Sequence, residues 1–315
     1  MDEQLLSKRF VIVVGKGGVG KSTIASTLGR LAARSGLRTV IAEFSDNASV
    51  PRLFGRTSAD YRPVMLEDNL FALCIRPEPA LHEYALRKIR FESVYRLVFE
   101  NTAVRRLLRA IPGLTELLVL GKAFDLERET DAQGRHAWDL VIVDAPSTGH
   151  GVNLFRLPQV LLEVVQRGPL ADEARAMRSL IQDKVRTVVH LVALPEELPA
   201  QETLELAEAV RTELGMHLGL LFVNRVWPSL ASEETTDSLE PVRTSEDPDL
   251  RRAMACFDHL RGRRRAQEPH LEMLEQGLDI PLLRVSEIFD VDFGLDALER
   301  IGDEVQSGID QEETS

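Results

Sequence analysis

The sequence predicts an α/β fold: a doubly wound, mostly parallel sheet with helices on both faces. Short apolar, β-branched runs recur along the chain, turn residues bound them, and stretches with helical spacing lie between them. Apolar strands that alternate with helices are typical of a parallel sheet that is covered on both sides. Right-handed crossovers then place the ligand crevice at the carboxyl ends of the strands.

The expected elements follow in order along one domain, residues 1–315. The strand-like runs are Phe10–Val14, Thr39–Ala42, Leu70–Ile75, Leu140–Val143, Val188–Ala193 and Leu220–Val223. The clearest helical stretches are Ser22–Ser35, Gln201–Leu214 and Leu295–Val305. Two segments break the alternation, and we interpret them as insertions: a helical one at about 80–137, and an acidic loop followed by a helix at about 227–277. We expect a flexible acidic tail at about 304–315.

The net charge of −12 comes from 38 Lys and Arg against 50 Asp and Glu. Segments 231–250 and 302–315 contribute −6 and −5 of it, so the remainder of the chain is nearly neutral. Nucleic acid is disfavoured as a partner, because its phosphates need Lys and Arg. No apolar run approaches the roughly 18 residues of a membrane span. We expect no signal peptide and a cytoplasmic protein.

The first strand runs directly into a phosphate-binding loop. Residues 15–23 read GKGGVGKST and satisfy GxxxxGK[ST] between a strand and a helix. In such a loop glycines let backbone N–H groups point at phosphate oxygens, and the helix N-terminus adds its dipole. Lys21 is expected to reach the β- and γ-phosphates, and Ser22 to bind Mg²⁺. The predicted cradle consists of Gly15, Gly17, Gly18, Val19, Gly20, Lys21, Ser22 and Thr23.

A second candidate site residue ends the strand before a turn. Asp144 closes Leu140–Val143 and is followed by the turn-forming residues of APSTGH. A carboxylate in this position beside a phosphate-binding loop is expected to take part in holding Mg²⁺. The turn can re-form according to whether a γ-phosphate is present, and we assign Thr148, Gly149 and His150 to this switch.

The string DAPSTGHGVNLFRLP at 144–158 resembles the second switch of the arsenite-pump and tail-anchored-protein targeting ATPases. Further segments resemble bacterial members of that family: LPEELP at 194–199, FVNRV at 222–226 and IPLL at 280–283. The resemblance covers most of the chain except the acidic loop and tail. It implies an ATPase of the P-loop NTPase fold, with ATP and Mg²⁺ as cofactors.

The resemblance also implies roles for individual residues. Lys16 matches the lysine that, in these deviant P-loop ATPases, crosses a dimer interface to the partner's nucleotide, so it joins Lys21 as a catalytic candidate. Asn224 matches the residue that reads the adenine, and its amide is chemically suited to that. Pro281 and Leu282 would flank the base. The NKxD motif expected for guanine is absent, so ATP is favoured.

The match fails at the first switch. Family members carry an aspartate there that orients the attacking water, but this chain has Ser45 at the aligned position and Asp46 one residue later. A serine hydroxyl does not hold a proton as a carboxylate does. Two hypotheses remain open: Asp46 takes over as the catalytic residue, which we favour, or the chain is an ATP-binding interaction subunit that hydrolyses ATP poorly.

The two cysteines bear on the choice among relatives. Cys74 and Cys256 are isolated, so they form neither an arsenite-binding thiolate cluster nor a CxxC zinc clasp nor an iron–sulfur site. Each is interpreted as a small buried apolar residue. An arsenite pump is therefore disfavoured.

The helical insertion is where the targeting branch of the family builds a client groove. Apolar residues recur at helical spacing through 91–124, which fits either a stripe packed on the domain or a groove for an apolar helix. We expect a homodimer, or a heterodimer with a paralogous subunit, that uses ATP to act on a protein client, membrane-bound or with an apolar helix. The contrasting hypothesis is a positioning ATPase of the partitioning or cell-division type.

Overall fold

The structure, a computed structural model, describes residues 8–44, 49–58, 60–88, 113–146, 151–230 and 239–312. Within these ranges eight strands form one sheet in the order β3-β4-β2-β5-β1-β6-β7-β8. All neighbouring strands are parallel except β3 and β4. The strands are β1 (Phe10–Gly15), β2 (Thr39–Glu43), β3 (Val64–Glu67), β4 (Leu70–Cys74), β5 (Leu140–Asp144), β6 (Thr187–Ala193), β7 (Leu218–Val226) and β8 (Leu282–Ser286). The predicted fold class is confirmed.

The central strands are buried on both faces, which explains why their sequences are continuously apolar rather than alternating. Successive side chains point to opposite faces of a strand. In β1, Ile12 belongs to one core cluster and Val13 to the other. The sheet thus separates two layers of helix.

The two layers draw on different parts of the chain. One core cluster includes residues of α2 (Lys21–Arg34), α3 (Val50–Leu53) and α14 (Leu295–Glu312). The other includes residues of α7 (Leu114–Arg128), α8 (Gly151–Val164), α9 (Pro169–Ile181), α10 (Glu197–Thr212) and α13 (Pro248–Gly277).

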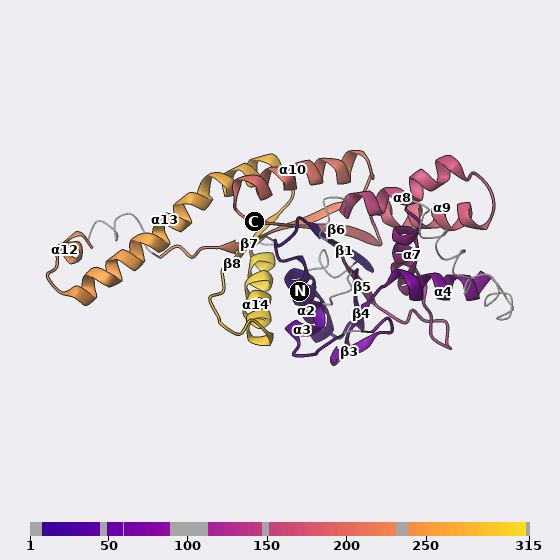
Figure 1. Cartoon of the computed structure of the whole chain (residues 1–315), viewed down its shortest axis with the longest axis horizontal. Helices are drawn as coiled ribbons and strands as arrows, with labels where there is room; N and C mark the ends of the chain where they lie inside the picture. The colour runs from indigo at the N-terminus through magenta and orange to yellow at the C-terminus, as the bar shows by residue number, and fades with distance from the viewer. Residues whose placement is uncertain are drawn as a thin grey trace.

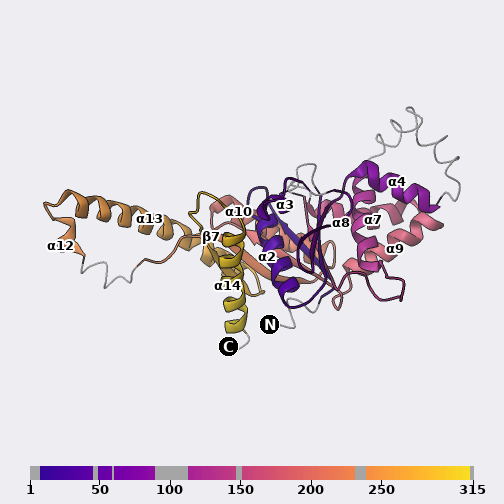
Figure 2. The same cartoon turned by 90° about the horizontal axis from the view of Figure 1, so that it is seen from below.

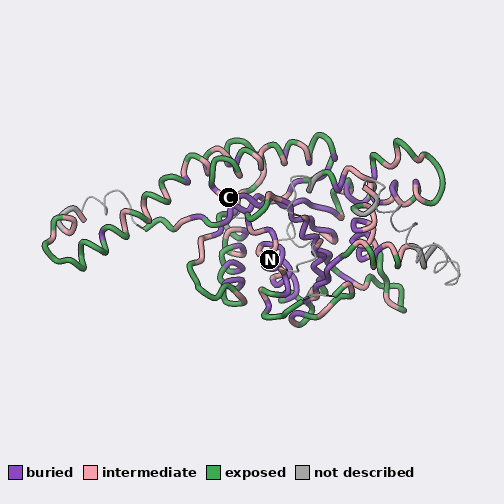
Figure 3. The backbone as a smooth tube through the Cα atoms, in the orientation of Figure 1, coloured by how far each residue is buried: buried purple, intermediate pink, exposed green. Residues whose placement is uncertain are grey.

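Two helical regions extend the molecule at opposite ends of the sheet domain (Figures 1 and 2). At one end α4 (Pro77–Lys88) and α7 lie beside α8 and α9. At the other end the 30-residue α13 projects outward and carries the short α12 (Glu240–Arg243) at its far end. Figure 3 shows buried residues concentrated in the sheet and its covering helices, whereas the outer half of α13 is mostly exposed.

The inner half of α13 is tied to the sheet. Leu271 and Leu274 are completely buried in the core, and α13 packs on α10 and β7. The buried side chain of Gln267 donates a hydrogen bond to the Arg225 carbonyl oxygen at 2.9 Å and accepts one from the Trp227 N–H at 2.8 Å. The projecting helix is therefore anchored directly behind the end of β7.

Two expectations are corrected by these elements. Residues 304–312 do not form a flexible tail: they continue α14, because Ile301, Val305 and Ile309 recur every four residues and are buried in the core. The strands β3 and β8 were not among the expected runs, since both lie at sheet edges and their burial is incomplete. Among the described residues, no helix combines the length and the apolar character that crossing a membrane requires.

Candidate functional site

The loop between β1 and α2 depends on its glycines. Gly18 and Gly20 have φ values of 81° and 98°, in the left-handed region that favours glycine. A Cβ at Gly15 would collide with the backbone oxygen of Val192, and one at Gly20 would collide with the Asn224 amide. The loop can therefore keep this close-packed shape only with these residues.

The remaining loop residues leave one side open. Gly17 and Gly18 are exposed, Thr23 is half-buried, and Val19 is buried beneath the loop. The loop thus rests on the sheet through Val19 and presents its glycine turn to a ligand. This is the geometry expected for a cradle of backbone N–H groups at a helix N-terminus.

Lys21, the first residue of α2, is only 5% exposed. Its Nζ donates a hydrogen bond to the carbonyl oxygen of Lys16 at 2.9 Å, across the base of the loop. Burial lowers the pKa of Lys21, and the nearby Asp144 carboxylate opposes that shift. A buried ammonium that closes the loop offers a concentrated positive charge to an anion.

Asp144, the last residue of β5, is 4% exposed and lies against the start of α2. Its Oδ2 accepts a hydrogen bond from the Ser22 hydroxyl at 2.6 Å. Burial raises the pKa of Asp144 to about 7; the neighbouring Glu43 acts in the same direction, whereas Ser22 and Lys21 oppose it. Its Oδ1 is buried with no hydrogen-bond partner among the described residues.

Sequence reasoning missed a second buried carboxylate at this edge. Glu43 is the last residue of β2 and stands beside Asp144 in the register of the paired strands. It accepts hydrogen bonds from the Ser49 hydroxyl at 2.5 Å and from the Ser49 N–H at 2.6 Å. The available signal was a strand, TVIAE, that ends in a carboxylate just as LVIVD does.

These side chains fit a magnesium ion that is held together with a phosphate. Ser22 and Asp144 provide only oxygen donors, which Mg²⁺ prefers. The buried Oδ1 of Asp144 is an acceptor without a hydrogen-bond partner among the described residues. The described residues contain no group of three or more His, Cys, Asp and Glu arranged around a metal position.

Lys16 pairs within its own chain. Its Nζ lies 2.9 Å from Oε1 of Glu202 in α10, and both side chains are partly exposed. The carbonyl oxygen of Lys16 meanwhile accepts the Lys21 hydrogen bond. The structure thus shows Lys16 at the rim of the loop.

Asn224, in β7, supports the loop from below. Its Nδ2 donates to the Val19 carbonyl oxygen at 2.9 Å, and its Oδ1 accepts from the Arg225 N–H at 2.9 Å. The side chain is buried and touches the position of Gly20. The structure therefore brings Asn224 to the phosphate-binding loop.

Pro281 and Leu282 do not lie at this edge, which corrects their predicted place beside the base. The Pro281 carbonyl oxygen accepts a hydrogen bond from Leu221, and Leu282 pairs with Leu221 in the sheet. Leu221 precedes Asn224 by three residues, which is about 10 Å along a strand. The two residues sit at the amino end of β8, because the parallel register fixes which end of β8 faces the loop.

Two aromatic residues lie at the carboxyl ends of the same strands instead. Trp227 follows β7 and Phe289 follows β8, and their rings make an edge contact with centroids 5.0 Å apart. Phe289 is 58% exposed. Sequence reasoning did not single out this pair, since it depends on how β7 and β8 are aligned.

The remaining predicted site residues lie outside the described residues. These are the two candidates of the first switch and three residues of the second: Ser45, Asp46, Thr148, Gly149 and His150.

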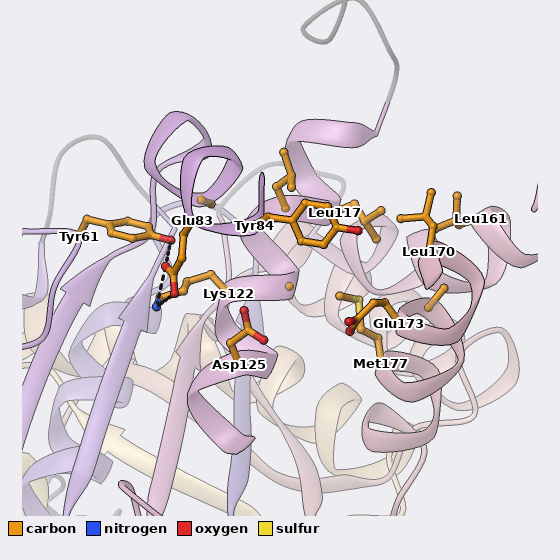
Figure 4. A pocket seen from close by; sticks show the side chains of 14 residues that line it. Tyr61, Glu83, Tyr84, Leu117, Lys122, Asp125, Leu161, Leu170, Glu173 and Met177 are labelled. Atoms are coloured by element: carbon orange, nitrogen blue, oxygen red, sulfur yellow. Dashed lines mark hydrogen bonds and ion pairs between the residues drawn. The ribbon is translucent and has the colours of Figure 1, made fainter. Parts of the chain in front are cut away.

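A separate cavity of about 130 Å³ lies among α4, α7, α8 and α9 (Figure 4). One wall is apolar and includes Leu117, Leu161 and Met177. At the other wall Glu83 accepts hydrogen bonds from Tyr61 at 2.6 Å and from Lys122 at 3.0 Å. Most residues of the predicted apolar stripe at 91–124 lie outside the described residues, but its described part contributes Leu117 and Leu118 to this cavity.

The two cysteines are on different elements. Cys74 ends β4 and is buried, whereas Cys256 lies on α13 and is exposed. The interpretation of Cys256 as a buried apolar residue is thus corrected, because it falls on the projecting part of that helix.

Comparison with known proteins gives consistent matches. The family model described as anion-transporting ATPase matches residues 8–169. ATPase BagA of Mycobacterium tuberculosis is 29% identical over 261 residues, which cover 79% of this chain and 74% of that protein. The arsenical pump-driving ATPase of Escherichia coli is 27% identical over 248 residues, which cover 73% of this chain and 41% of that protein. ATPase ASNA1 homolog 2 of Paramecium tetraurelia is 26% identical over 157 residues, which cover 49% of this chain and 46% of that protein.

Proposed function

Because this chain belongs to the anion-transporting ATPase family and is an ATPase, we propose that it binds Mg-ATP in the cradle of residues 15–23 and couples ATP hydrolysis to a change in a dimer. The family resemblance found in the sequence is confirmed. The observation that carries the proposal is the arrangement of Lys21, Ser22 and Asp144 behind an open glycine turn.

The phosphate end of the nucleotide is held by the loop. Backbone N–H groups of the glycine turn bind phosphate oxygens, and the Lys21 ammonium exchanges its hydrogen bond to the Lys16 carbonyl for the β- and γ-phosphates. Ser22 and Asp144 would hold a magnesium ion, which when bound would neutralise charge that develops on the transferred phosphoryl group. Asp144, whose pKa burial raises, would be stabilised as an anion there.

The base lies at the carboxyl ends of β7 and β8. Asn224 reaches that edge, and its amide keeps a second N–H and further lone pairs beyond the two hydrogen bonds that hold the loop. The exposed ring of Phe289, supported by Trp227, offers an apolar surface to a purine. These two aromatic residues take the place that was predicted for Pro281 and Leu282.

The dimer completes the site. In a second copy Lys16 would leave Glu202 and reach the partner's nucleotide, where a cation stabilises transition-state charge as an arginine finger does. Asp46 is the candidate for orienting the attacking water, because the neighbouring Ser45 cannot act as a base. A homodimer or a heterodimer with a paralogous subunit would act on a protein client through the helical insertion.

Nucleotide binding and single-turnover hydrolysis test this proposal. Lys21→Ala should lower the affinity for ATP and the hydrolysis rate by at least about 100-fold, because buried charge at a phosphate contributes several kcal/mol. The exposed Lys184, just before β6, provides the control variant Lys184→Ala, which should behave like wild type.

The first-switch alternatives differ in the same assay. If Asp46 acts, Asp46→Asn should slow hydrolysis while ATP still binds. A wild-type rate at the background without enzyme, unchanged by Asp46→Asn, would instead assign the chain to the hydrolysis-poor interaction subunits. Sedimentation with a non-hydrolysable ATP analogue measures the dimer, and an unchanged monomer would contradict the role of Lys16.

A further inference from the structure

Ser49 brings a second hydroxyl to Ser22. It lies directly before α3, and its Oγ is 3.0 Å from the Ser22 Oγ. No sequence motif marks Ser49, because it reaches Ser22 only through the fold of the chain after β2. The two hydroxyls stand at the carboxyl edge of the sheet, between the ends of β2 and β5.

The shortest hydrogen bonds of these two hydroxyls run to carboxylates on different strands. A serine hydroxyl has one proton to donate and two lone pairs. The Ser49 hydroxyl has two acceptors within reach, Glu43 Oε1 at 2.5 Å and Ser22 Oγ at 3.0 Å, and the Ser22 hydroxyl donates to Asp144 at 2.6 Å. We assign the single Ser49 proton to Glu43, because the carboxylate is nearer and charged. With the proton on the Glu43 side, the 3.0 Å contact between the two oxygens has lone pairs on both sides.

This arrangement matches two adjacent ligands of one cation. Ligands at about 2.1 Å from an octahedral Mg²⁺ and at right angles to each other are about 3.0 Å apart. The Ser22 and Ser49 oxygens have that separation. Each hydroxyl is backed by a buried carboxylate, and Asp144 keeps one buried oxygen without a partner among the described residues.

We propose that Ser49 is a second hydroxyl ligand of the magnesium ion in the Mg-ATP complex, beside Ser22, and that Glu43 is the positioning residue that takes the Ser49 proton and so aims its lone pairs at the metal. This inference rests on the proposed function. It adds a ligand from the segment that follows β2, so the metal links that segment directly to the phosphate-binding loop.

The direct test is the affinity of Mn²⁺, a spectroscopic substitute for Mg²⁺, in the complex with ADP, measured by electron paramagnetic resonance. Ser49→Ala should weaken Mn²⁺ binding about tenfold or more, the range expected when a residue of a metal site is lost. Ser49→Thr keeps the hydroxyl and should bind Mn²⁺ like wild type. Ser58→Ala makes the same change at an exposed serine in the loop after α3 and serves as the matched control.

A change of metal preference separates a ligand from a merely structural residue. Ser49→Cys replaces the hydroxyl by a thiol, which favours soft metals. The ratio of Cd²⁺ to Mg²⁺ affinity should therefore rise at least tenfold in the ADP complex of Ser49→Cys and stay unchanged in Ser58→Cys. An unchanged ratio in Ser49→Cys would overturn the proposal.

Glu43 is tested through Ser49. Glu43→Leu removes the acceptor at similar volume, so Mn²⁺ affinity should fall, and combining it with Ser49→Ala should add little, because Glu43 acts by orienting that hydroxyl. A full additional loss in the double variant would contradict the positioning role.

Nucleotide binding in the presence of Mg²⁺ separates the two proposals. Wild-type protein that binds neither ADP nor ATP would remove the proposed function itself. Wild-type protein that binds Mg-ATP, together with a Ser49→Ala variant of unchanged Mn²⁺ affinity, would leave that function intact and overturn only the role of Ser49.

Discussion

Asp144 and His190 occupy equivalent positions on either side of β1, yet their surroundings differ completely. Both residues pair with Val13 in the register of the sheet, one from β5 and the other from β6, and both are buried. Strand β1 lies between β5 and β6, so two inter-strand spacings, about 10 Å, separate the two residues. A comparison of the two shows what distinguishes a buried ionisable group in a site from one in a core.

Strand β5 ends at Asp144, whereas β6 continues past His190 to Ala193. Asp144 therefore faces the start of α2, where Ser22 and Lys21 are close and one carboxylate oxygen remains unpartnered among the described residues. His190 lies in mid-strand, where its Nδ1 accepts a hydrogen bond from the Leu220 N–H at 3.0 Å and its ring meets Phe222 edge-on.

Burial has opposite effects on the two groups. It raises the pKa of Asp144 to about 7, and it lowers the pKa of His190 to about 3, with the charge of His217 adding to the second shift. Burial favours the neutral form in both cases. His190 stays neutral with one ring nitrogen as an acceptor and its buried Nε2 without a hydrogen-bond partner among the described residues. Asp144 differs in lying against the Ser22 hydroxyl and near the Lys21 ammonium, both of which favour its anion.

The largest expected effect is on ATP hydrolysis, which should depend on Asp144 but not on His190. Asp144→Asn should lower ATP hydrolysis by about 100-fold or more, because the amide cannot provide the negative oxygen that we propose for holding the metal. The nucleotide-free protein should not lose stability, since the amide avoids the burial of a charge. Steady-state hydrolysis and urea unfolding without nucleotide measure the two outcomes.

His190→Gln is the comparison variant for that experiment. It should leave hydrolysis within about twofold of wild type, because His190 supports the core rather than the site. A loss of activity as large as that of Asp144→Asn would mean that the two positions are not distinct.

The pH dependence of stability should show opposite signs for the two residues. The His190 pKa falls from its ordinary value near 6.5 to about 3 on folding. Its contribution is therefore complete above pH 6.5 and is lost as the pH falls, by about 3 kcal/mol between pH 6.5 and pH 4. The free energy of unfolding in urea should be measured against pH for wild type and His190→Gln. The fall in stability toward acid pH should be smaller in the variant by this amount.

For Asp144 the raised pKa makes the protein less stable as the pH rises, the opposite of the effect of His190. The Asp144 contribution without nucleotide is present below its ordinary pKa near 3.8 and is lost as the pH rises toward 7. Asp144→Asn should flatten that part of the curve. His217, whose pKa burial also lowers, acts in the same direction as His190, so His217→Gln serves as a control for the remaining acid-side slope.

The smallest expected effect tests how tightly His190 is enclosed. A Cβ at Gly219 would lie 2.7 Å from the Cε1 of His190 and 2.6 Å from the Cγ2 of Val188. Gly219→Ala should therefore destabilise the protein by about 1–3 kcal/mol through overpacking. Thermal unfolding measures the change, and the activity per folded molecule should remain.

The matched control is Gly262→Ala in α13. Nothing lies within 4 Å of a Cβ at Gly262, and alanine is favoured over glycine in a helix by up to about 1 kcal/mol. This variant should be as stable as wild type or more so. Equal destabilisation by both substitutions would show that the His190 pocket is not tightly packed.

The sequence predicted those parts of the fold and site whose residues are consecutive in the chain or form a continuous apolar run. The phosphate-binding loop could be recognised because its residues are consecutive, and Asp144 because a buried strand ends in it. The central strands could be recognised because both faces are buried, which leaves their sequences apolar. Incompletely buried edge strands such as Val64–Glu67 and Leu282–Ser286 carry no such pattern.

The site residues that the sequence did not predict depend on strand register and tertiary packing. Glu43 meets Asp144 only because β2 and β5 pair, and Ser49 reaches Ser22 only because the chain turns back after β2. Pro281 was misplaced for the same reason, since its position depends on the alignment of β8 with β7. In α14 the acidic residues obscured the buried positions Val305 and Ile309, which face the core all the same.

The projecting α13 has a mechanical consequence. Its 30 residues span about 45 Å, and its inner half is fixed to the end of β7 through Gln267. Residue Asn224 of the same strand holds the phosphate-binding loop through the Val19 carbonyl. From Gln267 to the outer end at Pro248 the helix spans about 29 Å, so a rotation of 10° at Gln267 would carry that end through about 5 Å. A small rotation where α13 meets the sheet is thus amplified at its projecting end (Figure 1), and it starts next to the strand that supports the phosphate-binding loop.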